Sequence, residues 1–176
     1  MNDTITVRVE MDAKTFRSFA WFDAFSRQKR WRSPALFAAI LLAFAAVCFL
    51  MQGRAEQAAL LGGVLTAVGV ILPLGYFLQF YVTLRDQVKK FGLSQPKEVY
   101  SLTFSPEHVL VTNGKEENAL AWDSIFAAYR RKGCIYLYAA ANKAFLLPED
   151  QIPGGGDGLW AMLEGHMAPE RLFARG

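Results

Sequence analysis

Three side chains in the second half of the sequence could act as a nucleophile or a base: His108, Ser124 and Cys134. Catalysis of this kind needs a nucleophile, a base and an orienting group in contact. The sequence places no carboxylate or other partner near these three at the spacing of a catalytic motif, and its 2 cysteines form no metal or redox motif. We therefore expect a protein that is not an enzyme and that carries neither a metal site nor a cofactor.

A cluster of basic residues directly precedes the first long apolar stretch. It consists of Arg27, Lys29, Arg30 and Arg32, with Trp31 among them. Cations and amphipathic rings beside an apolar helix are typical of a segment that lies at a membrane surface and faces anionic headgroups. The cluster therefore predicts contacts with the lipid bilayer.

A second basic cluster, Arg130, Arg131 and Lys132, lies between two predicted strands. Such a group could contact a lipid headgroup or a protein partner, or it could be the solvated end of a hairpin. Nucleic acid is not expected as a partner, because 19 Lys and Arg against 16 Asp and Glu give a net charge of only +3.

The apolar residues, 53% of the chain, are distributed unevenly. Residues 33–53 and 57–84 contain no charged side chain, which predicts membrane-spanning helices at about 34–51 and 58–82. A cleaved signal peptide is the alternative for residues 1–51, but the charged region before its apolar core would be far too long. A membrane hairpin is the better interpretation.

The basic residues also predict how this hairpin is oriented. The first cluster precedes the first span, and Arg85, Lys89 and Lys90 follow the second, whereas the turn at 52–56 holds only Arg54, offset by Glu56. The positive-inside rule then places both termini in the cytoplasm. Neither span contains Asp, Glu, Lys, Arg or His, which disfavours a transporter or a pump.

Small residues recur along one side of each span, which lets two helices approach closely in lipid. They are Ala35, Ala39, Ala43 and Ala46 in the first span, and Gly62, Thr66, Gly69 and Pro73 in the second. Because the turn is so short, these faces most simply meet within the hairpin. A homodimer formed through the same faces is the alternative.

The N-terminal segment combines a strand with a helix. Residues 4–10 alternate apolar and polar side chains, which predicts a strand that pairs with the sheet of the soluble part. Asp12 offers an N-cap for a following helix with aromatic residues at helical spacing. Two interpretations of this helix stay open, because it could lie at the cytoplasmic membrane interface or pack on the soluble domain.

The soluble part reads as short strands joined by tight turns. The predicted strands cover residues 97–104, 108–112, 118–122, 125–130, 134–139 and 143–147. Connections this short predict an antiparallel meander that is curled or closed, so that few edges stay exposed. We expect Trp122 to pack in the core, and Asp157 to cap a final helix that closes the sheet with Leu159, Trp160 and Leu163.

Several motifs of this soluble part carry a family resemblance. They are Phe104 with Val109 and Val111, the run Trp122-Asp123-Ser124-Ile125, the pair Tyr136 and Tyr138, and Leu146-Leu147-Pro148. Together with the hairpin, this pattern resembles the YcxB-like family of bacterial membrane proteins. The resemblance implies a bacterial inner-membrane protein whose cytoplasmic domain is similar to a pleckstrin-homology barrel, and it implies no reaction.

These observations together predict an α+β membrane protein with three segments. Residues 1–32 form a strand and an amphipathic interfacial helix, residues 33–91 form the transmembrane hairpin with a cytoplasmic extension, and residues 92–176 form the barrel-like β domain. We expect a two-pass, membrane-anchored binding or scaffolding protein that recruits a protein partner of unknown identity. The alternative is a structural subunit of a membrane complex assembled through the hairpin.

Overall fold

The computed structural model describes residues 4–51, 53, 57–114 and 116–174. The chain forms two compact units, one made of residues 1–19 and 93–176, here called the β unit, and one made of residues 20–92, the hairpin unit. Across the described residues the fold is α+β, with two four-stranded sheets in the β unit and two long apolar helices in the hairpin unit. Arg54 and Glu56 of the predicted turn lie outside the described residues.

The first sheet contains the N-terminal strand, as the alternating pattern predicts. Its order is β1 (Ile5–Met11), β2 (Lys97–Phe104), β3 (His108–Thr112) and β4 (Glu117–Ala121). Strand β1 pairs antiparallel with β2, with Val7 opposite Leu102, and both side chains are fully buried. The predicted pairing of residues 4–10 with the sheet is therefore confirmed, and the β unit is assembled from segments on both sides of the hairpin.

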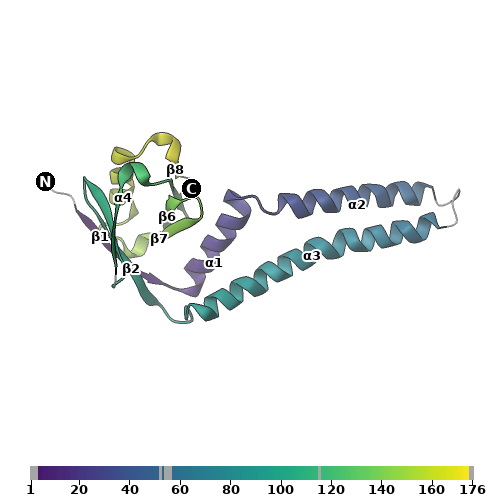
Figure 1. Cartoon of the computed structure of the whole chain (residues 1–176), viewed down its shortest axis with the longest axis horizontal. Coiled ribbons are helices and arrows are strands. Elements are labelled where there is room, and N and C mark those ends of the chain that lie inside the picture. The colour runs from purple at the N-terminus through teal and green to yellow at the C-terminus, as the bar shows by residue number, and fades with distance from the viewer. Residues whose placement is uncertain (1–3, 52, 54–56, 115, 175–176) are drawn as a thin grey trace. The chain divides into compact units, whose positions relative to one another are not determined.

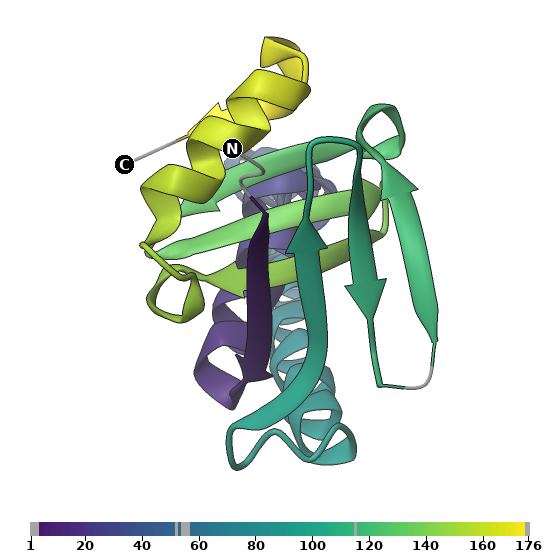
Figure 2. The same cartoon turned by 90° about the vertical axis from the view of Figure 1, so that its left-hand side faces the viewer.

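The second sheet differs from the predicted meander. Its order is β7 (Lys143–Pro148), β6 (Cys134–Ala140), β5 (Ala127–Arg131) and β8 (Leu172–Ala174). Strand β8 pairs parallel with β5, so the sheet is not purely antiparallel. The described strands form two separate sheets rather than one closed barrel, and in Figure 2 the strands of one sheet run steeply across those of the other. The meander is interrupted after β4 by the short 3-10 turn Trp122–Ser124.

Side chains close one corner between the two sheets, where β1 approaches β7. The amide of Gln151 accepts from the Glu10 N–H at 2.8 Å and donates to the Glu10 carbonyl at 2.9 Å. The Tyr100 hydroxyl accepts from the Leu146 N–H at 2.7 Å and donates to the Leu146 carbonyl at 3.2 Å. Burial raises the pKa of Tyr100, which keeps this hydroxyl a donor. Backbone groups on two edge strands are thereby satisfied without strand pairing.

Helix α4 (Gly156–His166) packs into the β unit as predicted, with Leu159, Trp160 and Leu163 buried. The expected cap is wrong, because the N-cap is Gly155, which takes a φ of 86° that favours glycine. Asp157 instead lies in the first turn of the helix, where it forms an ion pair described below.

Trp122 has the core role that the sequence predicts, although it lies in a turn rather than a strand. Its indole N–H donates to the Ser105 carbonyl at 3.1 Å. Its ring stacks on His166 at 4.7 Å between centroids and lies 6.3 Å from the Phe104 ring. Trp122 therefore ties the β2–β3 turn to the end of α4.

The hairpin unit consists mainly of helices α2 (Arg32–Leu50) and α3 (Ala58–Lys90), which lie side by side in Figure 1. Both are long and apolar enough to cross a membrane. A Cβ added to Gly62 would lie 3.1 Å from the Phe49 ring and 3.2 Å from the Ala45 carbonyl oxygen. The prediction that small residues of the second span face the first helix is therefore confirmed at this position.

The predicted face of the first span is wrong. Ala45 is the buried alanine of α2, whereas Ala39, Ala43 and Ala46 are exposed. Position 41, four residues before Ala45, contacts α3 as well, since a Cβ on Gly69 would lie 3.4 Å from the Leu41 Cβ. Leu41 and Ala45 lie on one side of α2. Large side chains interleave with the glycines of α3, so close packing does not need small residues on both helices.

Candidate membrane-facing site

The segment between β1 and α2 positions the first basic cluster. Asp12 caps helix α1 (Ala13–Trp21) as predicted, because its carboxylate accepts from the Thr15 N–H at 2.7 Å, and this bond lowers the pKa of Asp12. The Phe19 ring lies 5.4 Å from Tyr136 and 6.2 Å from Tyr138, measured between centroids. Phe19, in the second half of α1, thus packs on the second sheet, in keeping with the interpretation of a helix packed on the soluble domain.

The end of this helix belongs to the hairpin unit, where aromatic rings join it to α3. The Trp21 and Phe25 rings stack at 4.6 Å, and Phe25 lies 5.5 Å from Phe77 and 5.0 Å from Phe80. Trp21 also contacts Phe80 edge-on at 5.3 Å, while 43% of Trp21 stays exposed. These four residues, here called the aromatic clamp, hold the segment before α2 against the middle of α3.

A π-helix, Phe22–Arg27, carries the chain from the aromatic clamp to the basic cluster. Its wider turn is visible in the Gln28 N–H, which bonds to the Asp23 carbonyl five residues back at 2.9 Å. The Asp23 carboxylate accepts from Arg27 Nε at 2.6 Å and from Gln28 Nε2 at 2.5 Å. One cation of the predicted cluster is therefore neutralised by a carboxylate four residues before it.

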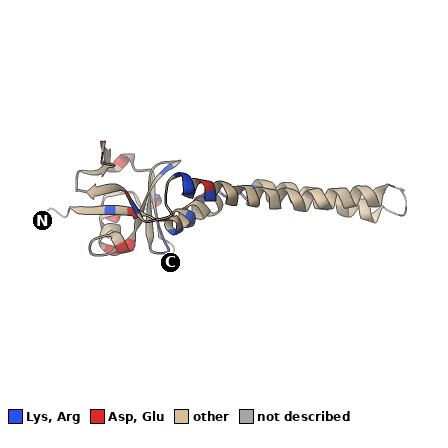
Figure 3. Ribbon diagram, turned by 90° about the horizontal axis from the view of Figure 1, so that it is seen from below, with Lys and Arg blue, Asp and Glu red and all other residues tan. Residues whose placement is uncertain are grey.

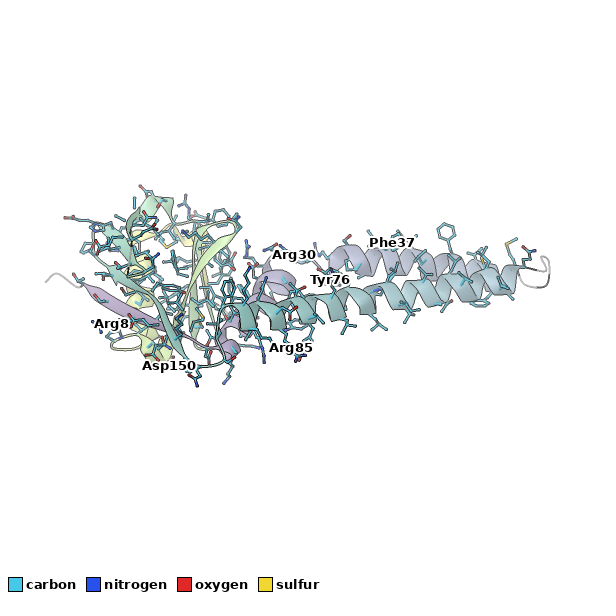
Figure 4. The ribbon with its side chains drawn as sticks, turned by 60° about the horizontal axis from the view of Figure 1, so that its bottom comes forward. Arg8, Arg30, Phe37, Tyr76, Arg85 and Asp150 are labelled. Atoms are coloured by element: carbon cyan, nitrogen blue, oxygen red, sulfur yellow. The ribbon has the colours of Figure 1, made fainter. Side chains whose placement is uncertain are left out.

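The other members of the first cluster are exposed. Lys29, Trp31 and Arg32 all present their side chains to the surroundings, and so does Arg30, whose Nε donates to Gln28 Oε1 at 2.8 Å. Figure 4 shows Arg30 and Arg85 near the end of the hairpin where the charged residues begin, and in Figure 3 most of α2 and α3 carries no charged residue. Within the hairpin unit, the exposed cations and Trp31 therefore lie next to the end of the apolar helices. Basic and aromatic residues at this position are typical of a membrane–water interface.

The second basic cluster has a different local structure. Arg130 on β5 donates to both carboxylate oxygens of Glu149, at 2.8 and 2.9 Å, and lies 2.7 Å from an oxygen of Asp157. These bonds raise the pKa of Arg130, although its charge is permanent in any case. Arg130 therefore joins β5 to the start of α4.

The remaining members of that cluster lie at or beside a tight turn. Arg131 ends β5, and Lys132 and Gly133 have φ values of 49° and 72° in the two-residue connection to β6. Positive φ at both positions is typical of a type I′ hairpin turn. Lys132 is exposed at its tip.

The structure gives a local role to two of the three side chains that could do acid–base or nucleophilic chemistry, Cys134 and Ser124. Cys134 is buried in β6, and burial raises its pKa to about 12, so its thiol stays protonated near neutral pH. The Ser124 hydroxyl donates to the Ala121 carbonyl at 2.6 Å within the 3-10 turn. His108 belongs to β3, opposite Ala121. Within the described part of the chain, no group of three His, Cys, Asp or Glu side chains could hold a metal ion.

Sequence reasoning missed the aromatic clamp, although a signal for it exists. Phe77 and Phe80 are three residues apart on α3 and therefore share one face of the helix. Their partner ring, Phe25, belongs to the predicted aromatic helix. No local pattern indicates that these two faces meet, because the contact joins segments about fifty residues apart.

Comparisons with known proteins bear on the β unit. No curated protein and no solved structure matches the chain. A family described as YcxB-like protein matches residues 104–157. This range extends from the last residue of β2 to the first turn of α4, and it contains Trp122 and the Arg130–Glu149 pair. Residues 104–157 are therefore similar to the YcxB-like family, in the region where the sequence motifs predict the resemblance.

Proposed function

We propose that this protein is a non-enzymatic membrane anchor for a binding or scaffolding module. Helices α2 and α3 cross the bacterial cytoplasmic membrane, both termini are cytoplasmic, and the β unit acts at the inner leaflet. The observation that carries the proposal is a hairpin whose large apolar side chains are exposed, without one Asp, Glu, Lys, Arg or His between 33 and 51 or between 57 and 84.

The exposure of the hairpin supports a lipid environment. Leu50, Leu60 and Leu78 are 86%, 73% and 65% exposed. Removing one such side chain from water is worth about 1.5 to 3 kcal/mol, and soluble proteins rarely leave apolar patches of this extent uncovered. Helix α2 has 19 residues. At about 1.5 Å per residue it is roughly 28 Å long, close to the hydrocarbon core of about 30 Å.

The basic residues support the orientation. Lys29 and Arg30 precede α2, Arg32 begins it, and Lys89 and Lys90 end α3, whereas Arg54 is the single basic residue in the sequence between the helices. Each cation close to an anionic leaflet contributes about 1 kcal/mol. Because the aromatic clamp fixes the segment before the cluster to α3, these cations need little ordering when they meet headgroups.

The β unit supports the binding part of the proposal through its architecture. Two crossed sheets with α4 packed against them agree with the pleckstrin-homology-like domain that the family resemblance implies. Cys134 is buried in this unit, and the Ser124 hydroxyl forms a hydrogen bond within a turn. The edge strand of a sheet is suited to holding a segment of a partner protein.

The topology is tested by cysteine labelling in whole cells. Cys48 and Cys134 are first replaced by Ala, and single cysteines are introduced at Gly53 and at Lys97. We expect an impermeant maleimide to label position 53 in intact cells and position 97 only after permeabilisation. Labelling of position 97 but not 53 in intact cells would reverse the orientation.

The membrane contact is tested by replacing Lys29, Arg30 and Arg32 with Gln and leaving Arg27, whose pair with Asp23 supports the π-helix. We expect faster proteolysis around residues 92–97 in vesicles that contain anionic lipid. Vesicles of neutral lipid should abolish the difference between variant and wild type. The control is the double variant Arg8→Gln, Lys143→Gln, which changes two cations of the β unit. The protease should cleave it at the wild-type rate.

One observation favours the alternative of a structural subunit assembled through the hairpin. Ala39, Ala43 and Ala46 are exposed on α2, where a second helix could approach closely. Ala43→Cys in a chain without its native cysteines should then form a disulfide-linked dimer in membranes. If this variant stays monomeric under oxidising conditions, the structural-subunit alternative is contradicted and the binding-module proposal remains.

A further inference from the structure

One edge of strand β5 is covered by a later segment of the same chain. Strand β8 pairs parallel with it, and the register sets Leu172 against Ala128, Phe173 against Tyr129 and Ala174 against Arg130. Parallel strands normally follow a long crossover, and here α4 supplies it. The short strand β8 thus completes a sheet that would otherwise end at β5.

Two side chains hold this short strand by specific contacts. The Phe173 ring stacks on Tyr129, with centroids 4.7 Å apart and planes 13° from parallel. The Arg171 guanidinium donates from Nη1 to the carbonyl oxygens of Asp123 at 3.0 Å and Ile125 at 3.2 Å. The β5 edge therefore offers an aromatic face and, beside it, a pair of carbonyl acceptors that prefer a cation.

Strand β8 covers the β5 edge less completely than side chains cover the edges at the corner between β1 and β7. Phe173 remains 45% exposed and Ala174 is exposed, so β8 buries little apolar surface. At the β1 and β7 corner, by contrast, half-buried Tyr100 and the Gln151 amide form hydrogen bonds with backbone groups of the edge strands. Segments with few buried contacts open at low free-energy cost. Strand β8 is the least buried strand of this sheet.

We propose that the β5 edge is a docking site for an extended segment of a partner protein, and that Arg171–Ala174 occupies it in cis. The partner segment adds parallel to β5 and carries a basic residue two positions before an aromatic one, as Arg171 precedes Phe173. Strand addition to a sheet edge gives affinity through main-chain bonds and specificity through side-chain contacts. The proposal rests on the binding function proposed above and names its partner chemistry.

Occupancy in cis makes the apparent affinity depend on how often β8 leaves. If the edge is open in about a tenth of the molecules, a partner binds about tenfold more weakly than it binds a permanently open edge. Weakening the Phe173 stack should therefore strengthen binding of an external segment. If β8 only stabilises the sheet and the β5 edge is not a docking site, weakening the Phe173 stack would not raise the affinity for an external segment.

The test uses the purified full-length protein in detergent micelles and a fluorescent peptide with the sequence of residues 168–174, APERLFA. Fluorescence anisotropy gives the affinity for the wild type, for Phe173→Ala and for Arg171→Ala. Phe126→Ala is the matched control, because Phe126 is a phenylalanine of the β unit with similar exposure, 49%. A peptide in which Arg and Phe are both replaced by Ala tests the chemistry of the segment.

We expect Phe173→Ala and Arg171→Ala to bind the peptide about tenfold more tightly than the wild type and Phe126→Ala. The Ala-substituted peptide should not bind any of them. The proposal is overturned if folded Phe173→Ala, with an unchanged near-ultraviolet spectrum, has no higher affinity than the wild type. It is also overturned if the altered peptide binds equally well.

Exchange of β8 between two copies is the competing occupant. In a Tyr129→Cys, Phe173→Cys variant, such an exchange would form disulfide bonds between two copies of the chain. Dimers that do not bind the peptide would overturn the proposal. The experiments distinguish failure of the membrane proposal from failure of this one, because peptide binding in micelles does not depend on membrane topology. A chain that binds the peptide but fails the labelling test at Gly53 and Lys97 would lose its proposed orientation and keep this site.

Discussion

The hairpin unit and the β unit use the same apolar residue types in opposite ways. Leu102, Leu137 and Leu147 of the β unit are fully buried, whereas Leu60 and Leu78 of α3 are mostly exposed. In the β unit, apolar side chains from strands distant in sequence cover one another. In the hairpin, two helices cannot cover each other all round, so many large apolar side chains stay exposed. The difference teaches that apolar content alone does not indicate where a core lies.

The largest expected effect comes from a charge in the β unit core. Val7→Asp buries a carboxylate opposite Leu102 where Val7 has no exposure. We expect the β unit to lose about 4 kcal/mol or more of its free energy of unfolding. Thermal melting followed by near-ultraviolet circular dichroism measures the loss. Arg8→Asp, on the exposed face of the same strand, should change stability by about 0.5 kcal/mol or less.

A slightly smaller effect is expected from a cavity beneath α4. Trp160→Ala removes a side chain that is 7% exposed and should cost about 3 to 5 kcal/mol. The same melting experiment checks it, with Glu164→Ala on the exposed side of the helix as the control. A loss no larger than that of the control would mean that α4 contributes little to the core, and the contrast between the units would weaken.

A charge on the hairpin should leave folding of the β unit unchanged and oppose membrane insertion instead. Ile71 lies near the middle of the apolar part of α3 and is 64% exposed. Ile71→Asp should cost insertion about 3 kcal/mol, whereas Ile71→Ala should be tolerated. The fraction of protein that stays in membranes after carbonate extraction measures the effect. Equal retention of both variants would contradict a membrane-spanning hairpin.

The smallest effect is expected at the second basic cluster. Arg130→Gln removes the ion pairs with Glu149 and Asp157, which are partly open to solvent. We expect a loss of about 1 kcal/mol in the stability of the β unit, which shrinks at high salt because exposed charges are screened. Melting at low and high ionic strength measures it. The control is Lys132→Gln at the exposed turn, which should not change the stability of the β unit. If both variants lose the same stability, the ion pairs of Arg130 do not contribute to it.

The sequence by itself determined the elements and their approximate bounds. Six of the strands in the soluble part, the strand before α1 and helix α2 agree with their predicted ranges to within a few residues, and α3 joins the predicted second span to the extension predicted after it. Each depends on a local pattern, whether alternation, helical spacing or uninterrupted apolar character, that neighbouring residues fully specify. The cap of α1 by Asp12 is local in the same sense.

Tertiary structure decided which surfaces meet. Arg130 reads as an available cation in the sequence, and only the fold brings Glu149 and Asp157 to it from segments beyond β6. The parallel strand β8 has three residues, too few to display a period, and it forms because α4 returns the chain to β5. The face of α2 was likewise decided by how Phe49 and Leu41 fit against the glycines of α3. Such contacts depend on the shapes of two partners at once, and no pattern within one segment encodes both.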